Sequence, residues 1–144
     1  MRGSYILLIR LSEAETISPG RLADVHFPDG YYAYVGSALG GLEARLKRHL
    51  SRDKKRHWHI DYLLPKASIT DIIIGETRDR VECAIAQALS SQFASILGFG
   101  SSDCHCSSHL FFAPERKPMK AGIIATLTAL AIPPRLMRPG GQPK

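Results

Sequence analysis

"GYYAYVGSALGGLEARLKRHL", residues 30–50, joins a tyrosine-rich strand to a cationic helix through a short glycine-rich connection. Side chains alternate between the two faces of a strand, so Tyr32, Tyr34 and Gly36 are predicted to share one face. Two glycines then break the chain before a helix that begins near Leu42. The stretch therefore predicts tyrosine hydroxyls close to a helix that carries positive charge.

The remaining segments predict an α+β domain. Strands are predicted over 4–11, 23–30, 31–37, 67–75 and 110–113. Helices are predicted over about 42–51, 57–65, 79–97 and 119–132, with Asp79 as the N-cap of the third. We expect a small mixed or antiparallel sheet flanked by helices over 1–113. An apolar helix and a basic, proline-rich tail follow over 114–144, with 133–144 expected to be disordered.

Length and composition limit the class of protein. A chain of 144 residues with 44% hydrophobic content can form one domain with its own core. Three cysteines, an odd number, argue against a secreted disulfide framework. The longest apolar run, 121–132, is too short to cross a bilayer, and Arg10 interrupts the apolar run at the N-terminus. These features predict a soluble cytoplasmic protein.

The positive charge is local. The formal net charge is +6, and residues 45–56 alone contain seven basic residues and one acid. From residue 114 onward there are six basic residues and one acid. Such a distribution favours a polyanionic partner, most often nucleic acid, although a solvated helix face gives the same pattern.

The basic helix has one apolar stripe. A helical wheel places three leucines on it: Leu42, Leu46 and Leu50. Arg45 and His49 lie along one edge of this stripe, and Arg48 lies just beyond them. A half-desolvated arginine is well suited to bind a phosphate through its planar guanidinium. Alternatively, its stem covers the stripe while its charged end stays in water.

Glu82 lies within the apolar arc of the helix predicted to follow Asp79. A carboxylate turned toward a core is costly unless it is paired or coordinates a metal. Alternatively, Glu82 belongs to the first turn, where the helix dipole tolerates an acid. A glutamate, an arginine and tyrosines together suit metal-assisted phosphodiester cleavage: the metal neutralises the phosphate, the arginine stabilises the developing charge and a tyrosine takes a proton from water. That tyrosine would need its pKa lowered by a nearby cation.

Several strings resemble the GIY-YIG nuclease superfamily. They are "GSY" at 3–5 and "YVG" at 34–36, followed by Arg45 on the next helix and Glu82 on a later one. The closer resemblance is to the small Uri branch of this superfamily. It is carried by "GYYAYVGSA", "HWHIDYLL" and "GSSDCHCSSH" and covers about residues 3–112.

The resemblance implies a GIY-YIG-like fold and a one-metal endonuclease acting on DNA. Tyr5 would activate water and Tyr34 would lie beside it in the same hydrogen-bond network. Arg45 would contact the scissile phosphate, with His49 as an auxiliary group. Glu82 would be the protein ligand to Mg²⁺ or Mn²⁺. The chain departs from the pattern in having Ser4 inside the first triplet and no asparagine, which many members carry near the end of the domain.

Further residues are predicted to bind nucleic acid. Gly36 would let the strand pass close to the helix or the substrate. The remaining candidates are lysines, arginines and histidines: Lys47, Arg48, Arg52, Lys54, Lys55, Arg56, His57 and His59. "HWHID" at 57–61 also matches the start of a zinc-hydrolase motif, but Tyr62 replaces its last histidine and the chain is too short for that fold. No base-reading element is recognisable, so single-stranded or structured DNA is the expected substrate.

Two alternatives remain open at this stage. The same fold could be a nucleic-acid-binding module with little or no cleavage. Alternatively, Cys104, Cys106 and His109, with Asp103 and either Cys83 or His57 as further candidate ligands, could hold zinc and stabilise an interaction domain. C-x-C-x2-H is an unusual ligand spacing, and buried thiols in a structural loop explain the same residues.

Overall fold

The computed structural model describes residues 2–20, 22–38, 41–51, 58–101 and 106–139. Six antiparallel strands form one sheet in the order β6-β7-β4-β1-β5-β8. Their bounds are β1 Gly3–Leu11, β4 Gly30–Ala38, β5 Ser68–Glu76, β6 Ala94–Ser95, β7 Leu110–Ala113 and β8 Pro134–Met137. A separate ribbon pairs β2 (Glu15–Ile17) with β3 (Val25–Phe27). The predicted α+β class is confirmed.

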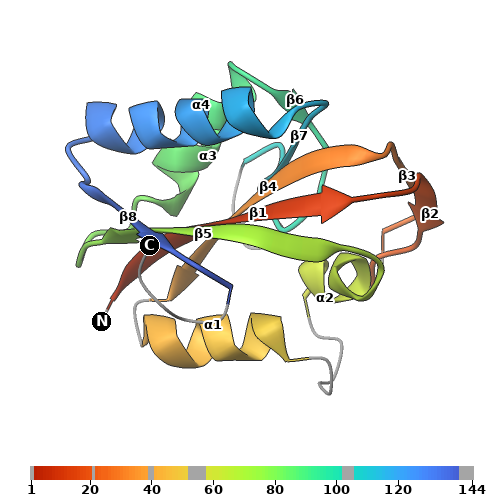
Figure 1. Cartoon of the computed structure of the whole chain (residues 1–144), viewed down its shortest axis with the longest axis horizontal. Helices are drawn as coiled ribbons and strands as arrows, with labels where there is room; N and C mark the ends of the chain where they lie inside the picture. The colour runs from red at the N-terminus through yellow and green to blue at the C-terminus, as the bar shows by residue number, and fades with distance from the viewer. Residues whose placement is uncertain (1, 21, 39–40, 52–57, 102–105, 140–144) are drawn as a thin grey trace.

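Helices cover both faces of the sheet (Figure 1). One face carries α1 (Leu42–Leu50), α2 (Ile60–Leu63) and the short 3-10 helix η1 (Leu64–Lys66). The other carries α3 (Glu82–Ser90) and α4 (Arg116–Ala129). No helix in the described parts of the chain is long and apolar enough to cross a membrane.

The central strand β1 is buried on both faces, as its nearly continuous apolar run predicts. Tyr5, Leu7 and Ile9 belong to the core beneath α1 and α2. Ile6 and Leu8 belong to the core beneath α3 and α4. β1 therefore holds two hydrophobic layers together, and any side chain at its odd positions faces α1.

The expected disordered tail is wrong over residues 134–137. These residues form the edge strand β8, which pairs with β5 from Ile72↔Met137 to Gly75↔Pro134. Proline is tolerated on an edge strand because its missing N–H costs no hydrogen bond there. The preceding helix α4 is fixed to β5 by buried Asp71, which binds Arg116 and Lys120.

Helix α3 is shorter than predicted. It starts at Glu82 after Val81 rather than at an Asp79 cap, and it ends at Ser90. The chain then turns into β6 at Ala94, so Phe93 and Ile96 pack from either side of this short strand, while Leu97 is 73% exposed. In α1, Leu50 is 37% exposed, so the predicted leucine stripe is buried only at its first two members.

Gly36 is required by the position of Tyr5. The β1–β4 register places the two residues opposite each other. A Cβ atom at position 36 would lie 2.3 Å from the Tyr5 ring and hydroxyl. The expected close approach to a helix or a substrate is therefore replaced by a close approach to Tyr5.

We predict that Gly36→Ala destabilises the fold by about 1–3 kcal/mol, because the added methyl group must displace a fully buried ring. Urea unfolding measures this loss. Tyr5→Leu removes the ring atoms that would clash, so the cost of Gly36→Ala should fall in that background. If Gly36→Ala destabilises the wild type and the Tyr5→Leu variant equally, the contact with Tyr5 is not the reason for a glycine at position 36.

Candidate active site

Three aromatic side chains meet between the sheet and α1. The Tyr5 hydroxyl lies 2.6 Å from Nε2 of His49, a hydrogen bond between residues 44 positions apart. The Tyr34 ring lies edge-on to His49 with 6.0 Å between centroids. All three are buried, at 1%, 7% and 3% exposure for Tyr5, Tyr34 and His49. Their strand and helix positions thus converge on one point.

Arg45 borders this group from α1. Its Nη1 donates a hydrogen bond to the Ser37 carbonyl oxygen at 3.0 Å. Its guanidinium lies 4.4 Å from the centre of the Trp58 ring, a cation–π contact. Trp58 also lies against His49, with ring centroids 5.8 Å apart. Trp58 is a residue of this site that the sequence patterns did not assign, and its position two residues after the basic segment 45–56 was the available sign.

The tyrosine pKa values are raised, which corrects the expectation of an activated phenolate. Burial raises the pKa of Tyr5, and the charge and hydrogen bonding of Arg45 offset this only in part. Burial likewise raises the pKa of Tyr34 well above its usual value. Both side chains are therefore neutral phenols at physiological pH, and Tyr5 can donate its proton to His49 when Nε2 is unprotonated.

Glu82 reaches the same region from the first turn of α3. Its side chain is 31% exposed, and Oε2 lies 3.8 Å from Nδ1 of His109. Its negative charge contributes to the raised pKa values of both Tyr5 and Tyr34. The structure therefore brings together five residues proposed from sequence: Tyr5, Tyr34, Arg45, His49 and Glu82.

Arg48 is engaged in a different contact. It forms two hydrogen bonds with Asp61, at 3.0 and 2.9 Å, and lies 4.1 Å from the centre of Trp58. Asp61 is 1% exposed and also accepts a bond from the Trp58 backbone N–H at 2.8 Å. Asp61 therefore binds both the Arg48 guanidinium and a backbone N–H. Arg48 is thus part of the scaffold around Trp58.

His59 is also part of the scaffold. Its Nδ1 accepts a hydrogen bond from the backbone N–H of Gly100 at 2.8 Å, and its ring packs edge-on against Phe99. Burial lowers the pKa of His59. The neutral ring with its proton on Nε2 is the form that fits this bond, and the contact of His59 with phosphate stays a prediction.

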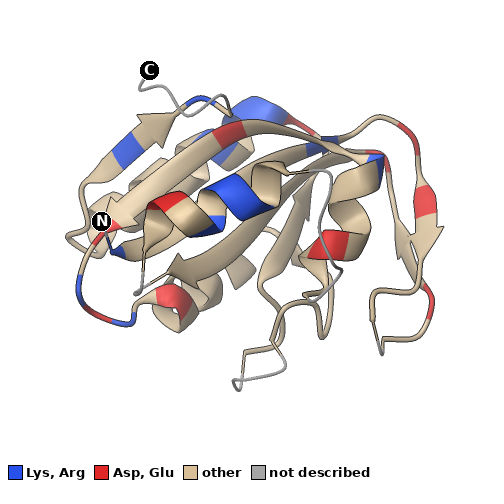
Figure 2. Cartoon of the chain, turned by 90° about the horizontal axis from the view of Figure 1, so that it is seen from below, with Lys and Arg blue, Asp and Glu red and all other residues tan. Residues whose placement is uncertain are grey.

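Lys47 is exposed on α1, where it can reach a partner. Figure 2 shows basic positions on α1 facing the viewer, while acidic positions are spread over the same view. The other predicted nucleic-acid contacts lie outside the described residues: Arg52, Lys54, Lys55, Arg56 and His57.

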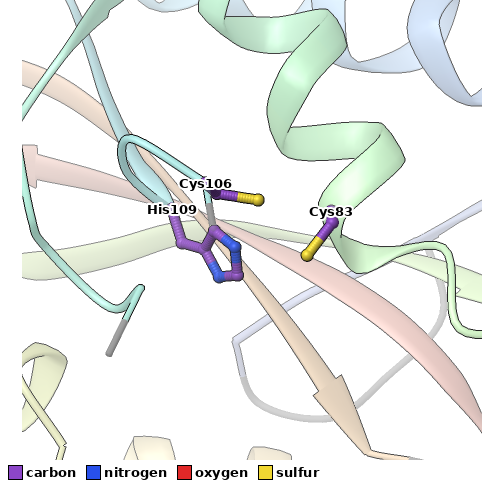
Figure 3. A group of neighbouring side chains, drawn as sticks. All are labelled: Cys83, Cys106 and His109. Atoms are coloured by element: carbon purple, nitrogen blue, oxygen red, sulfur yellow. The ribbon is translucent and has the colours of Figure 1, made fainter. Parts of the chain in front are cut away.

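Two cysteines and a histidine form a second cluster. One potential ligand atom from each of Cys83, Cys106 and His109 lies within 4.8 Å of the others (Figure 3). Burial lowers the pKa of His109. The sequence-based set also contained Cys104, which lies outside the described residues, and it named Cys83 only as a further candidate.

We predict that Arg48→Gln lowers the free energy of unfolding by about 2 kcal/mol, since it leaves the buried Asp61 carboxylate without its cation. Lys47→Gln, on the exposed face of the same helix, should change it by less than about 0.5 kcal/mol. Chemical denaturation of both variants makes the comparison. If both variants lose a similarly small free energy of unfolding, the Arg48–Asp61 contact contributes no net stability.

We predict that His59 makes the fold less stable in acid. Its folded-state pKa is below its unfolded value, so stability is complete above about pH 6.5 and falls as pH drops toward the folded-state pKa. His59→Asn keeps an acceptor near Nδ1 but cannot titrate, so it should lose less stability than wild type between about pH 8 and about pH 5. Urea unfolding at both pH values tests this, with His26→Asn on an exposed strand as control. If His59→Asn loses as much stability on acidification as the wild type does, His59 is not the cause of the loss.

Residues 4–132 match one protein family, described as a domain of unknown function, DUF123. No curated protein and no solved structure matches the chain.

Proposed function

The chain belongs to the DUF123 family, and we propose that it is a metal-dependent endonuclease that hydrolyses DNA. The observation that carries the proposal is the 2.6 Å contact between the Tyr5 hydroxyl and His49 Nε2, beside Arg45 and Glu82. A proton acceptor, a cation and a carboxylate are the groups that phosphodiester hydrolysis requires.

Proton transfer would run through Tyr5 to His49. Because burial raises the pKa of Tyr5, a free phenolate is a costly intermediate. A relay avoids it: the tyrosine oxygen accepts the proton of the attacking water as its own proton passes to His49 Nε2. Histidine is the usual group for this task near neutral pH. His49 is therefore the base in this proposal, and Tyr5 carries the proton to it.

Arg45 would stabilise charge on the phosphate. Its guanidinium is held by the Ser37 carbonyl and the face of Trp58. A pre-positioned cation lowers the barrier because it needs no rearrangement as charge develops. The neighbouring Arg48, bound to Asp61, keeps Trp58 in place.

Glu82 fits a hard divalent cation. Its carboxylate is partly exposed, so water can complete the ligand set, as Mg²⁺ and Mn²⁺ usually require. When bound there, the ion would supply neutralisation of the phosphate and of the leaving oxygen. The basic segment that includes the described residue Lys47 supports a DNA partner. Single-stranded or structured DNA remains the proposed substrate.

The test is cleavage of end-labelled single-stranded, duplex and flapped DNA with Mg²⁺ or Mn²⁺. Glu82→Gln should lose cleavage by about a hundredfold or more, because the ion is no longer held, while DNA binding is retained. Glu43→Gln is the matched control. It removes a carboxylate from the first turn of α1, on the exposed side of that helix, and should cleave like wild type.

Equal cleavage by wild type and Glu82→Gln would contradict the metal assignment. Binding of all these substrates without cleavage by the wild type would contradict the enzyme and favour a binding module on the same fold.

A further inference from the structure

The cluster of Cys83, Cys106 and His109 is separate from the residues assigned to DNA cleavage. Cys83 is the second residue of α3, and the other two lie just before β7. The chain has only three cysteines, and two of them meet here with a buried histidine. Figure 3 shows all three side chains directed toward one another.

The segment that supplies His109 is fixed by its backbone. The His109 carbonyl accepts a bond from Val35 N–H at 2.9 Å, and its own N–H donates to the Phe99 carbonyl at 2.8 Å. The Ser107 carbonyl accepts a bond from Gly98 N–H at 2.8 Å. Residues on either side of this segment are thus held against β4 and the 96–99 turn.

Helix α3, which supplies Cys83, is also held in place. α3 buries Ile85, Ala86 and Leu89 against the sheet, and Ile85 N–H bonds to the Val81 carbonyl at the helix start. Cys83 therefore projects from a packed helix toward the segment that supplies His109 just before β7. Ligands on rigid supports bind a metal with little loss of conformational freedom.

The spacing suits a tetrahedral ion. Zinc binds thiolate sulfur at about 2.3 Å and imidazole nitrogen at about 2.0 Å, so its ligand atoms lie roughly 3.5–4 Å apart. In the structure, the three potential ligand atoms lie within 4.8 Å of one another. Rotations about the side-chain bonds of the two cysteines and the histidine can close the difference of about 1 Å.

We propose that Cys83, Cys106 and His109 bind one Zn²⁺ ion. Thiolate and imidazole ligands favour zinc over the hard cations that Glu82 suits. Two thiolates cancel the charge of the ion, so a half-buried site carries no net charge. Three protein ligands and one water make a complete zinc coordination set.

This ion would join the start of α3 to the hairpin before β7. Cys83 directly follows Glu82, and the Glu82 carboxylate lies 3.8 Å from Nδ1 of His109. A carboxylate beside a ligating histidine orients its ring. The zinc site stands on the described geometry alone and does not depend on the proposed nuclease activity.

The test begins with the full-length chain purified without chelator. Elemental analysis should find about one zinc per chain. Co²⁺ added to the metal-stripped protein should give thiolate-to-cobalt absorption and the intense visible bands of tetrahedral cobalt. One equivalent of Zn²⁺ should remove both signals, and excess Mg²⁺ should not. This titration needs no variant, so a folding defect cannot obscure it.

Variants then identify the ligands. Cys83→Ser and Cys106→Ser should each lose the cobalt signal, and His26→Asn, a histidine on the separate β2–β3 ribbon, should keep it. Circular dichroism checks that each variant is folded. Retention of the signal in Cys83→Ser with loss in Cys104→Ser would overturn the proposed ligand set in favour of the local sequence motif.

Two further results would overturn the site altogether. One is wild-type protein that binds neither Co²⁺ nor Zn²⁺. The other is metal-free protein lighter by two hydrogens, in which Cys83 and Cys106 are found linked in one peptide after proteolysis.

Discussion

The candidate site depends on the contact between Tyr5 and Gly36 across the β1–β4 pair. Their register places them opposite each other, and the missing side chain at Gly36 leaves room for the Tyr5 ring. Because the ring lies over the strand, its hydroxyl reaches His49 on α1 at 2.6 Å. A backbone feature of one strand thus determines a hydrogen bond between another strand and a helix. The packing of Leu42 and Leu46 on the same core holds the helix at that distance.

Helix α1 separates the roles of two arginines that look alike in sequence. Both lie over Trp58, within 4.4 Å of its centre. Arg48 also binds the buried carboxylate of Asp61 through two hydrogen bonds, whereas Arg45 donates to a backbone carbonyl and acts on the Tyr5 hydroxyl. A charge-assisted pair is the stronger restraint. Arg48 therefore holds the tryptophan, and the tryptophan holds the arginine that faces the site.

Sequence patterns predicted the parts of the fold whose signal is local. Apolar runs and alternation identified β1, β4 and β5, and the leucine spacing identified α1. They missed β8, because this four-residue strand begins with a proline in a proline-rich tail and pairs with the distant strand β5. The end of α3 was missed for a similar reason: Phe93 and Ile96 continue the helical apolar spacing, but the chain leaves the helix after Ser90 and pairs Ala94 and Ser95 with β7.

For the candidate site, too, the sequence predicted local features and missed those that depend on distant contacts. Strand alternation and the family resemblance named Tyr5, Tyr34, Arg45, His49 and Glu82, which do come together. The direction of the Tyr5 pKa shift was not predictable, because it depends on how completely α1 covers the ring. The Arg48–Asp61 pair also could not be seen, since nothing local relates two residues 13 positions apart in different helices.

Glu82 and Cys83 are consecutive, yet they suit different ions. Successive side chains on a helix point about 100° apart, so the first turn of α3 can direct a carboxylate to one place and a thiol to another. Oxygen ligands favour Mg²⁺ or Mn²⁺, and thiolates favour zinc. His109 lies next to both residues, with one contact to the carboxylate and a place in the thiol cluster. If zinc fixes His109 and Cys83, it also fixes the helix turn that presents Glu82. The proposed zinc ion would then affect the proposed cleavage by positioning Glu82.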